Sequence, residues 1–147
     1  MELNFPQDEP IFPIRTAAEL LNISVHTLRM YEREGLIIPY QKETRHRLYS
    51  KVDIERIETI RRSIKVDKMS IAGIKRVYSL IPCWKFIDCT IEIRKDCQAY
   101  NGNSKPCWSY RHEEGACSTN DCRKCEVYND YGNCKSVKDL LREIISD

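Results

Sequence analysis

The stretch "TAAELLNISVHTLRMYEREGLI", residues 16–37, predicts two short helices joined by a tight turn. A capping-box pattern that begins at Thr16 predicts a first helix over residues 17–22. Ser24 offers an N-cap for a second helix, and Gly35 predicts its end. Because the link between them is only a few residues long, the two helices cannot lie antiparallel for any length. The sequence therefore predicts a helix-turn-helix crossing.

A short β-hairpin and two further helices are expected after this pair. Pro39 blocks a helix, and residues 45–49 have mixed strand character, so a hairpin, or wing, is predicted there. Ser50 and Ser70 each offer an N-cap ahead of isoleucines at helical spacing, which predicts a third and a fourth helix. Pro82 closes the fourth helix. This half of the chain should therefore bury a small continuous core.

The chain changes character after Pro82. There is no cysteine in residues 1–82, and all eight cysteines then follow, from Cys83 to Cys134. The aliphatic side chains in that segment are far too few to offset the ordering of its residues, at roughly 1.5 kcal/mol each. The segment should therefore fold only when its thiols are bridged, for example by a metal.

All eight cysteines are candidate metal ligands. Cys122 and Cys125 form the only close pair, the spacing that zinc modules usually repeat. The wide intervals between the others favour an iron–sulfur cluster, with zinc as the alternative. Reversible disulfides, with this close pair as the first choice, are a further alternative. His112 could ligate a metal, although an exposed loop position is the expectation for it. The candidate ligands are Cys83, Cys89, Cys97, Cys107, Cys117, Cys122, Cys125 and Cys134.

A final helix is predicted after the cysteine-rich segment. Ser136 begins a capping box ahead of an apolar stripe that runs from Val137 to Ile145. A lone helix of that length is marginal in water, so the stripe must pack on something. Two partners remain open: a second copy of the chain, which would close a dimer, or the helix's own subunit.

Composition gives the chain little net charge, formally +2. The N-terminal stretch lacks the features of a signal peptide, and no apolar run approaches the roughly 20 residues of a membrane span, which predicts a cytoplasmic protein. Thiols stay reduced there, so metal or redox chemistry is favoured over fixed disulfides. The expected fold class is mainly α with a small β-hairpin. The expected order is a tail (1–11), a winged helix-turn-helix domain (12–82), a cysteine-rich, loop-rich metal or redox domain (83–134) and a C-terminal amphipathic helix (135–147).

Three blocks, "TLRMYEREGLI", "HRLYSKVDIERIETI" and "MSIAGIKRVYSL", resemble the N-terminal domain of MerR-family transcription regulators. The resemblance covers residues 12–80, and "PIFPIRTAAELL" and "SIAGIK" look most like the heat-shock repressor branch of that family. It implies a winged helix-turn-helix whose second helix enters the major groove of double-stranded DNA. The family usually has a glycine near the hairpin tip, which "ETRHR" lacks.

The resemblance also implies roles for individual residues. His26 and Thr27, at the start of the recognition helix, would reach base edges, although chance surface placement is an equal alternative for His26 and for His46. Basic side chains of the helix and the wing would neutralise phosphates, and two tyrosines would bond phosphate oxygens or support the wing. The implied DNA-binding residues are His26, Thr27, Arg29, Tyr31, Arg45, Arg47 and Tyr49.

The partners follow from the same resemblance. MerR-family relatives dimerise through a long helix placed directly after the fourth one, where this chain has Pro82 and Cys83. A homodimer on a pseudo-palindromic operator is still expected, with its contact supplied elsewhere. RNA polymerase is a further conceivable partner of such a regulator, and no membrane is expected to take part.

A second resemblance concerns the cysteines. The blocks "CWKFIDC", "CQAY", "KPCW" and "CRKCEVY", in this order, look like the two-CW cysteine-rich module attached to bacterial sensory and regulatory proteins. The resemblance covers residues 83–128 and leaves Cys134 as an extra. It implies a metal- or redox-linked accessory domain without deciding the metal.

The sequence thus predicts a DNA-binding transcription regulator whose cysteine-rich domain binds a metal or an iron–sulfur cluster and senses metal or redox state. The alternative is a heat-shock-repressor-like regulator with a purely structural zinc domain. An enzyme, a thiol oxidoreductase using Cys122 and Cys125, is not favoured, because the alternating apolar segments of a βαβ unit are absent.

Overall fold

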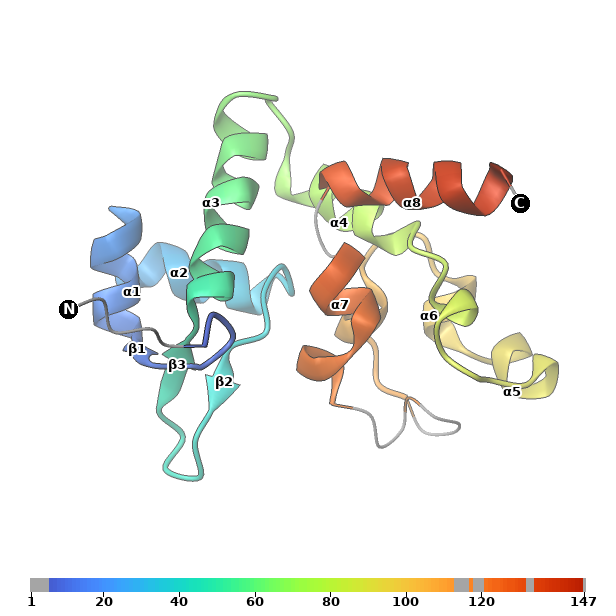
Figure 1. Cartoon of the computed structure of the whole chain (residues 1–147), viewed down its shortest axis with the longest axis horizontal. Helices are drawn as coiled ribbons and strands as arrows, with labels where there is room; N and C mark the ends of the chain where they lie inside the picture. Colours follow the sequence, from blue (N-terminus) through green and yellow to red (C-terminus); the bar gives the residue numbers. More distant parts are fainter. Residues whose placement is uncertain (1–5, 113–116, 118–120, 132–133, 147) are drawn as a thin grey trace. The chain divides into compact units, whose positions relative to one another are not determined.

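The computed structural model describes residues 6–112, 117, 121–131 and 134–146, and the side chains of residues 131 and 134–136 lie outside that description. The described chain is mainly helical, with a small three-stranded antiparallel sheet, which confirms the predicted fold class (Figure 1). It divides into two compact units, Met1–Arg62 and Ser63–Asp147. None of the described helices is long and apolar enough to cross a membrane.

The first unit contains the sheet. Its central strand, β3, pairs antiparallel with both of the others, and Phe12 lies opposite Tyr49. The two strands β2 and β3 form the predicted hairpin. The sequence predicts no strand at β1, because two residues that include a proline give no visible alternation. The strands are β1 (Phe12–Pro13), β2 (Tyr40–Gln41) and β3 (Arg47–Tyr49).

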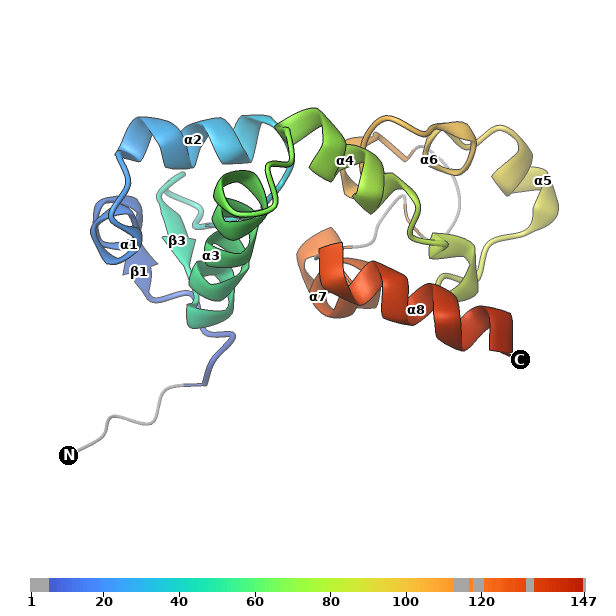
Figure 2. The ribbon, with the colours of Figure 1, turned by 90° about the horizontal axis from the view of Figure 1, so that it is seen from above.

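The predicted helix-turn-helix pair is confirmed as α1 (Ile14–Leu21) and α2 (Val25–Arg33), which contact each other. In Figure 2, α1 is seen nearly end-on while α2 is seen lengthwise, so the two helices cross. The hydroxyl oxygen of Ser24 accepts the backbone N–H of Thr27 at 3.0 Å, which confirms the predicted N-cap of α2. Gly35, with φ 74°, follows the end of this helix.

The start of α1 corrects one prediction. Thr16 lies inside the helix, and the N-cap position belongs to Pro13, which makes no side-chain cap hydrogen bond. The reason is that the chain passes from β1 straight into the helix, so no separate capping residue precedes it. Asn22, predicted as the last helical residue, is instead the C-cap, in the left-handed conformation at φ 54°.

The third helix, α3 (Lys51–Lys65), begins with its predicted capping box. The Asp53 N–H donates to the hydroxyl oxygen of Ser50 at 3.1 Å, and the Ser50 N–H donates to the Asp53 carboxylate at 2.7 Å. Apolar side chains from all three helices and the wing are buried in this unit. They are Ala17, Ala18, Leu21, Leu28, Tyr31, Leu36, Ile37, Tyr49, Ile54, Ile57 and Ile60.

The second unit packs α4 (Ile71–Ser79) against α8 (Cys134–Ser146), and α8 also contacts α7 (Glu126–Tyr131), as Figure 2 shows. The Ser70 hydroxyl accepts the Gly73 N–H at 3.0 Å, which confirms the predicted cap of the fourth helix. A cluster of fully buried apolar side chains joins α7, α8 and the chain just after α4, and Val77 of α4 packs against it. Its members are Ile81, Val127, Val137 and Leu140.

This core explains why the division by contacts differs from the predicted domain boundary. The sequence predicts a boundary after Pro82, whereas the division falls after Arg62, inside α3. Val77 of α4 and Ile81, just after this helix, pack in the same cluster as Val137 of α8. The fourth helix is therefore a structural part of the cysteine-rich unit.

The apolar stripe of α8 packs within its own unit, which decides between the two partners left open by the sequence. Val137 and Leu140 are each only 3% exposed, while Ile145, near the end of the stripe, is 80% exposed. The stripe is therefore not a free surface for closing a dimer. The predicted N-cap at Ser136 is wrong, because α8 already begins at Cys134.

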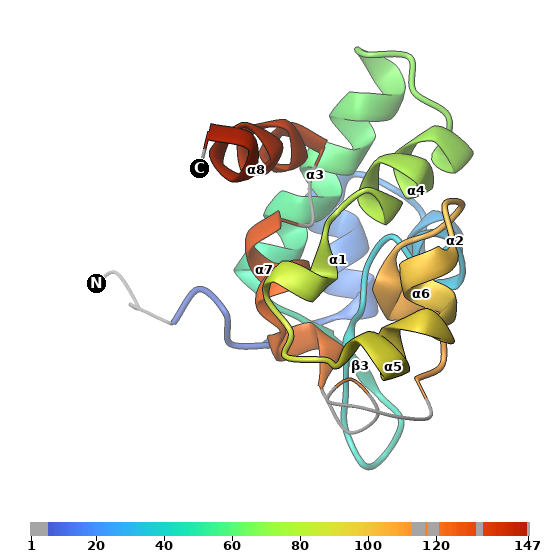
Figure 3. The ribbon, with the colours of Figure 1, turned by 90° about the vertical axis from the view of Figure 1, so that its right-hand side faces the viewer.

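The described chain between α4 and α7 forms five short helical elements rather than open loops. Each begins at a cysteine or within two residues of one, and α5 and α6 lie side by side in Figure 3. The short lengths leave most side chains of this segment half-buried. The elements are η1 (Cys83–Lys85), α5 (Ile91–Lys95), α6 (Gln98–Asn101), η2 (Cys107–Ser109) and η4 (Cys122–Lys124).

Candidate functional sites

The second helix presents a basic face to solvent. His26, Arg29 and Arg33 are spaced three and four residues apart along α2, so they share one side, and all three are exposed. Thr27, next to them, is half-buried, and its hydroxyl lies 2.9 Å from the hydroxyl of Ser24. Of the residues predicted to contact DNA from this helix, His26 and Arg29 therefore have free access to a ligand, whereas Thr27 also supports the cap.

The two predicted tyrosines are buried. Tyr31 is 4% exposed, and Tyr49 is fully buried with its hydroxyl donating to a carboxylate oxygen of Glu32. Burial raises the pKa of Tyr49, and the bond to Glu32 raises it further, so the phenol stays protonated. Of the two roles implied for these tyrosines, the position of Tyr49 favours support of the wing over a phosphate contact.

Glu32 also holds an arginine of the wing. Its second carboxylate oxygen lies 2.7 Å from the Nε atom of Arg47, and its side chain is 8% exposed against 43% for the arginine. One carboxylate on α2 thus binds two side chains of β3. The predicted wing residue Arg47 therefore positions the hairpin, while part of its guanidinium remains exposed.

At the wing tip, which lacks the glycine usual in the family, an arginine adopts the left-handed backbone conformation. Arg45 takes the left-handed conformation at φ 65°, and its N–H donates to the Lys42 carbonyl at 2.8 Å. Beside it, the Thr44 hydroxyl lies 2.9 Å from Nδ1 of His46. Arg45 and His46 are both exposed, so the tip presents polar and basic side chains to solvent.

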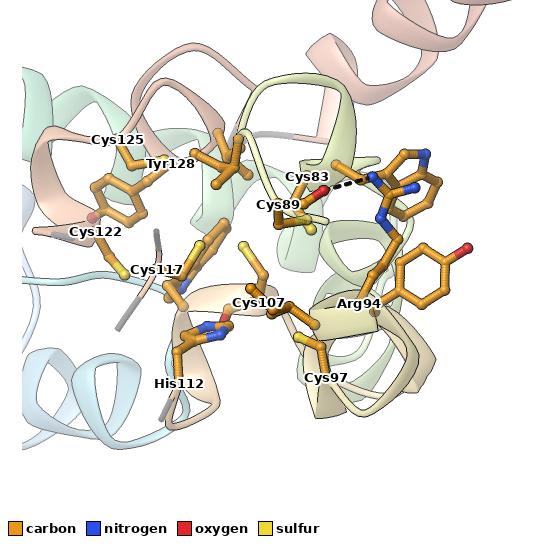
Figure 4. Close-up of a pocket in the computed structure, with 16 residues that line it drawn as sticks. Cys83, Cys89, Arg94, Cys97, Cys107, His112, Cys117, Cys122, Cys125 and Tyr128 are labelled. Atoms are coloured by element: carbon orange, nitrogen blue, oxygen red, sulfur yellow. Dashed lines mark hydrogen bonds between the residues drawn. The ribbon is translucent and has the colours of Figure 1, made fainter. Parts of the chain in front are cut away.

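Seven cysteines spread over more than forty positions of the sequence line a single cavity of about 50 Å³ in the second unit (Figure 4). Three of them lie in η1, η2 and η4, and the other four lie in the chain between the short elements. The side chain of the eighth candidate, Cys134, lies outside the described residues. The seven are Cys83, Cys89, Cys97, Cys107, Cys117, Cys122 and Cys125, and all of them are free thiols.

The cavity raises the pKa of several of these thiols. Burial, followed by repulsion from neighbouring thiolates, raises the pKa of Cys83 and of Cys117 to about 11 each. The same causes raise the pKa of Cys107 and of Cys122 above the ordinary thiol value. Several thiolates crowded into one cavity are therefore unfavourable until a cation compensates their charge.

One cation already lines the cavity. Nη2 of Arg94, on α5, donates to the Cys89 carbonyl at 3.1 Å, and its guanidinium lies 5.6 Å from the centre of the Tyr100 ring. A hydrogen bond to Cys89 raises the pKa of this arginine, so it stays charged. Its Nε atom is buried and has no hydrogen-bond partner among the described residues, which is unusual in a protein interior.

A histidine also faces the thiols. His112 is half-buried and lines the cavity, and its Nε2 lies 3.0 Å from the carbonyl oxygen of Cys107. The expectation of an exposed loop histidine is therefore wrong. Trp108, directly after Cys107, fixes this part of the chain. Its ring packs between those of Tyr78 and Tyr128, with centroid distances of 5.4 and 5.1 Å.

Comparisons with known proteins concern the part of the chain that carries α2 and the wing. Residues 12–80 match the family model described as "MerR HTH family regulatory protein". They form a MerR-family helix-turn-helix domain. A curated relative, "Putative heat shock protein HspR" from Streptomyces coelicolor, is 36% identical over 74 residues, which are 50% of this chain. The aligned part is 49% of the relative, so the chain spans about half the length of the curated protein it matches.

The MerR match ends after α4, which places this helix in both halves of the protein. By sequence, α4 belongs to the MerR domain, while by contacts it belongs to the cysteine-rich unit. Tyr78 of α4 touches Trp108, the residue directly after the cavity cysteine Cys107. The fourth helix of the MerR match is therefore in contact with the lining of the cysteine cavity, through this ring pair and through Val77 and Ile81.

The donors around the cavity fit a thiolate-ligated metal. Thiolates and imidazole are the ligands that zinc, copper(I) and iron–sulfur clusters prefer. Among the residues that the structure describes, no three His, Cys, Asp or Glu side chains are arranged as a completed metal site. Binding would therefore require the thiols to turn toward a common centre. The family model describes regulatory proteins, so the comparisons point to no enzyme.

Proposed function

We propose that this protein is a transcription regulator that binds double-stranded DNA through its MerR domain and holds a thiolate-ligated metal ion or iron–sulfur cluster in its cysteine cavity. The state of that centre controls the affinity for DNA. The observation that carries the proposal is the packing of Trp108, next to a cavity cysteine, against Tyr78 of α4 with the two rings tilted by 50°.

The DNA-binding part of the proposal is supported by the basic face of α2 and by the wing. His26 and Arg29 are exposed at the start of the second helix, which in helix-turn-helix proteins lies in the major groove. Arg45 and Arg47 on the wing would meet the phosphate backbone beside it. The ion pair between Glu32 and Arg47 would fix the spacing of helix and wing.

The metal-binding part is supported by the convergence of seven thiols on one cavity. Chance would scatter cysteines over a surface, and a packed interior would separate them. Bound there, a metal or cluster would supply the positive charge that allows these thiols to ionise. The cysteines of the cavity would hold it, and Arg94 would reduce the remaining negative charge.

Coupling follows from the position of α4. If removal of the metal loosens the cavity, Trp108 loses its fixed place and α4 loses part of its packing. The last helix of the MerR match is then no longer held in one conformation. A change in α4, which lies within the MerR match, would give the centre a physical means to change DNA binding without touching DNA.

We further propose that the regulator acts as a homodimer on a pseudo-palindromic operator, through a surface other than the buried stripe of α8. RNA polymerase is then a further partner at the promoter. A second candidate function is an HspR-like regulator with a permanently bound structural zinc ion, which the similarity to a putative heat shock protein favours. The two candidates differ in whether DNA affinity follows the state of the cavity.

The test measures DNA affinity as a function of metal content. Duplexes are selected from a random pool with anaerobically purified full-length protein, and fluorescence anisotropy then gives Kd for as-isolated, chelator-stripped and reloaded protein. Stripping should weaken operator binding by about 5-fold to 150-fold, the usual size of the coupling between two sites. Reloading should restore it.

The outcomes separate the candidates. Equal affinity of stripped and loaded protein would reject the sensor and leave the structural-zinc regulator. Failure to select any duplex, with a folded and loaded protein, would reject DNA binding itself. A short, matched random duplex in the same buffer serves as the control for nonspecific binding.

A further inference from the structure

We propose that the cysteine cavity is a two-centre metal site, and that His112 is the eighth ligand, binding a zinc-like ion through its Nδ1 atom. The inference rests on the proposed function, because it specifies the ligands of the thiolate site. It differs from the prediction made from the sequence, which favours an iron–sulfur cluster and expects His112 to be an exposed loop residue.

The number of donors is the first argument. Seven described thiols and His112 line the same cavity, which makes eight soft or borderline ligand groups. A structural zinc ion takes four ligands in a tetrahedron, so a single ion would leave four of these groups without a metal. A four-iron cluster held by four thiolates would leave the same number. Two tetrahedral ions use all eight.

The arrangement of the thiols supplies the second argument, since they gather toward two ends of the cavity. Figure 4 shows Cys122 and Cys125 at one end, Cys89 and Cys97 toward the other, and Cys107 between. The close pair comes from η4 and its C-cap, whereas the opposite end is built from the segment around α5 and α6.

Cys83 and Cys117 extend this division. In Figure 4, Cys83 lies beside Cys89, whereas Cys117 lies on the side of Cys122 and Cys125. Cys107 is assigned to the group of Cys83, because His112 lies toward Cys117 and completes the other group. The ligand sets that follow are Cys83, Cys89, Cys97 and Cys107 for one ion, and Cys117, Cys122, Cys125 and His112 for the other.

The hydrogen bond of His112 is the third argument. A carbonyl oxygen only accepts, so the 3.0 Å contact from Nε2 to the Cys107 carbonyl requires the proton on Nε2. In a neutral ring the Nδ1 atom then carries a lone pair. Metal-binding histidines almost always donate their other N–H to a carboxylate, a backbone carbonyl or water in this way. The partner here is the backbone of Cys107, whose thiol lines the same cavity.

The experiment counts metal centres in the full-length chain. Protein loaded anaerobically with zinc is measured by native mass spectrometry and metal analysis, and protein loaded with ¹¹³Cd is measured by NMR. The proposal expects two zinc ions per chain and two ¹¹³Cd resonances of different shift, one for four sulfurs and one for three sulfurs and a nitrogen. A single ion, or iron with inorganic sulfide in the as-isolated protein, would overturn it.

Variants of His112 test the ligand itself. His112→Ala should let a chelator remove one of the two zinc ions at least about tenfold more readily, since even outer-shell changes cost that much. His46→Ala, which removes the exposed histidine of the wing, is the matched control and should retain both ions equally. Unchanged retention of both ions by His112→Ala would contradict the assignment.

A conservative variant covers the case in which His112→Ala does not fold. His112→Cys should again hold two ions, and its cobalt(II) form should gain sulfur-to-cobalt charge-transfer absorption over the parent, because one nitrogen is replaced by a thiolate. An unchanged cobalt spectrum would contradict ligation by His112. A chain that binds no metal would overturn the proposed function too, whereas one centre with metal-dependent DNA binding would overturn this inference alone.

Discussion

The carboxylate of Glu32, near the end of α2, lies 2.7 Å from the Nε atom of Arg47 on β3. The same carboxylate accepts the hydroxyl of Tyr49, the last residue of that strand. Because Glu32 is nearly buried, both bonds form where water competes weakly. The helix that carries the exposed basic face and the strand that carries the wing are thereby locked into one spacing.

Removing one of these bonds should loosen the wing. Tyr49→Phe deletes a hydrogen bond to a charged, nearly buried group, and should destabilise the first unit by about 1.5–3 kcal/mol. Denaturant titration of the full chain measures the loss, and amide exchange should localise it to the hairpin. Tyr40→Phe, at an exposed wing position, is the control and should change stability little. Equal effects of both substitutions would contradict the bracing role of Tyr49.

Arg29 should contribute to DNA binding through charge alone. It is exposed on α2 and near the N-terminal half of the helix, so Arg29→Ala should leave the fold intact. If this arginine neutralises one phosphate, its removal should reduce the salt slope of log Kd by about 0.9 per subunit. Arg142→Ala, which removes the same charge from an exposed position on α8, is the control. An unchanged slope in Arg29→Ala would remove this arginine from the interface.

The two tryptophans should differ in their effect on α4. Trp108→Ala removes a ring that packs on both Tyr78 and Tyr128, and should destabilise the second unit by about 3 kcal/mol. Trp84→Ala, at a position that is 36% exposed and pairs with Tyr100, should cost clearly less. Amide exchange of residues 71–79 in the two variants makes the comparison. Similar exchange of α4 in both variants would contradict the proposed connection.

The stripe of α8 should behave as core and not as an interface. Leu140→Asp places a charge where the side chain is 3% exposed, and should unfold the second unit. Ile145→Asp, at a position that is 80% exposed, should change stability by less than about 0.5 kcal/mol. Denaturation and sedimentation of both variants test this. A folded Leu140→Asp chain with a lower mass than the parent would show that the stripe instead joins subunits.

Metal removal should affect the fourth helix as well as the cysteines. Because α4 shares the core of the second unit, chelation should raise amide exchange in residues 71–79 together with the cavity segments. Exchange in α1 and α2 should remain as in the loaded protein, since these helices bury their own apolar side chains. Unchanged protection of α4 after stripping would contradict the dependence of this unit on its thiols.

The predictions that succeeded rest on interactions between residues close in sequence. Ser24, Ser50 and Ser70 each accept the N–H three residues ahead, and the spacing alone predicts these caps. Thr16 has the same local pattern, and its prediction failed because the strand before it already leads the backbone into the helix. Local signals thus identify helices well and their first residues less well.

The predictions that failed or stayed open depend on distant partners. Nothing in the sequence near α4 says that its apolar face meets α8, since any apolar helix would satisfy it. The convergence of seven thiols is equally invisible in irregular spacings. For His112, one signal was present: a histidine inside a segment dense in cysteines. Its hydrogen bond to a backbone carbonyl requires the fold.

The packing of α4 against α8 has a consequence for the order in which the protein forms. Residues 80–133 lie between these two helices, so a ribosome must complete that whole stretch before α4 meets its partner. The helix-turn-helix half closes through contacts that are short in sequence and can form earlier, because loop closure is faster for nearby residues. During synthesis the chain therefore passes through a period in which its thiols are accessible and not yet enclosed. If the cavity holds the proposed metal, this interval is the time at which the thiols are open to it.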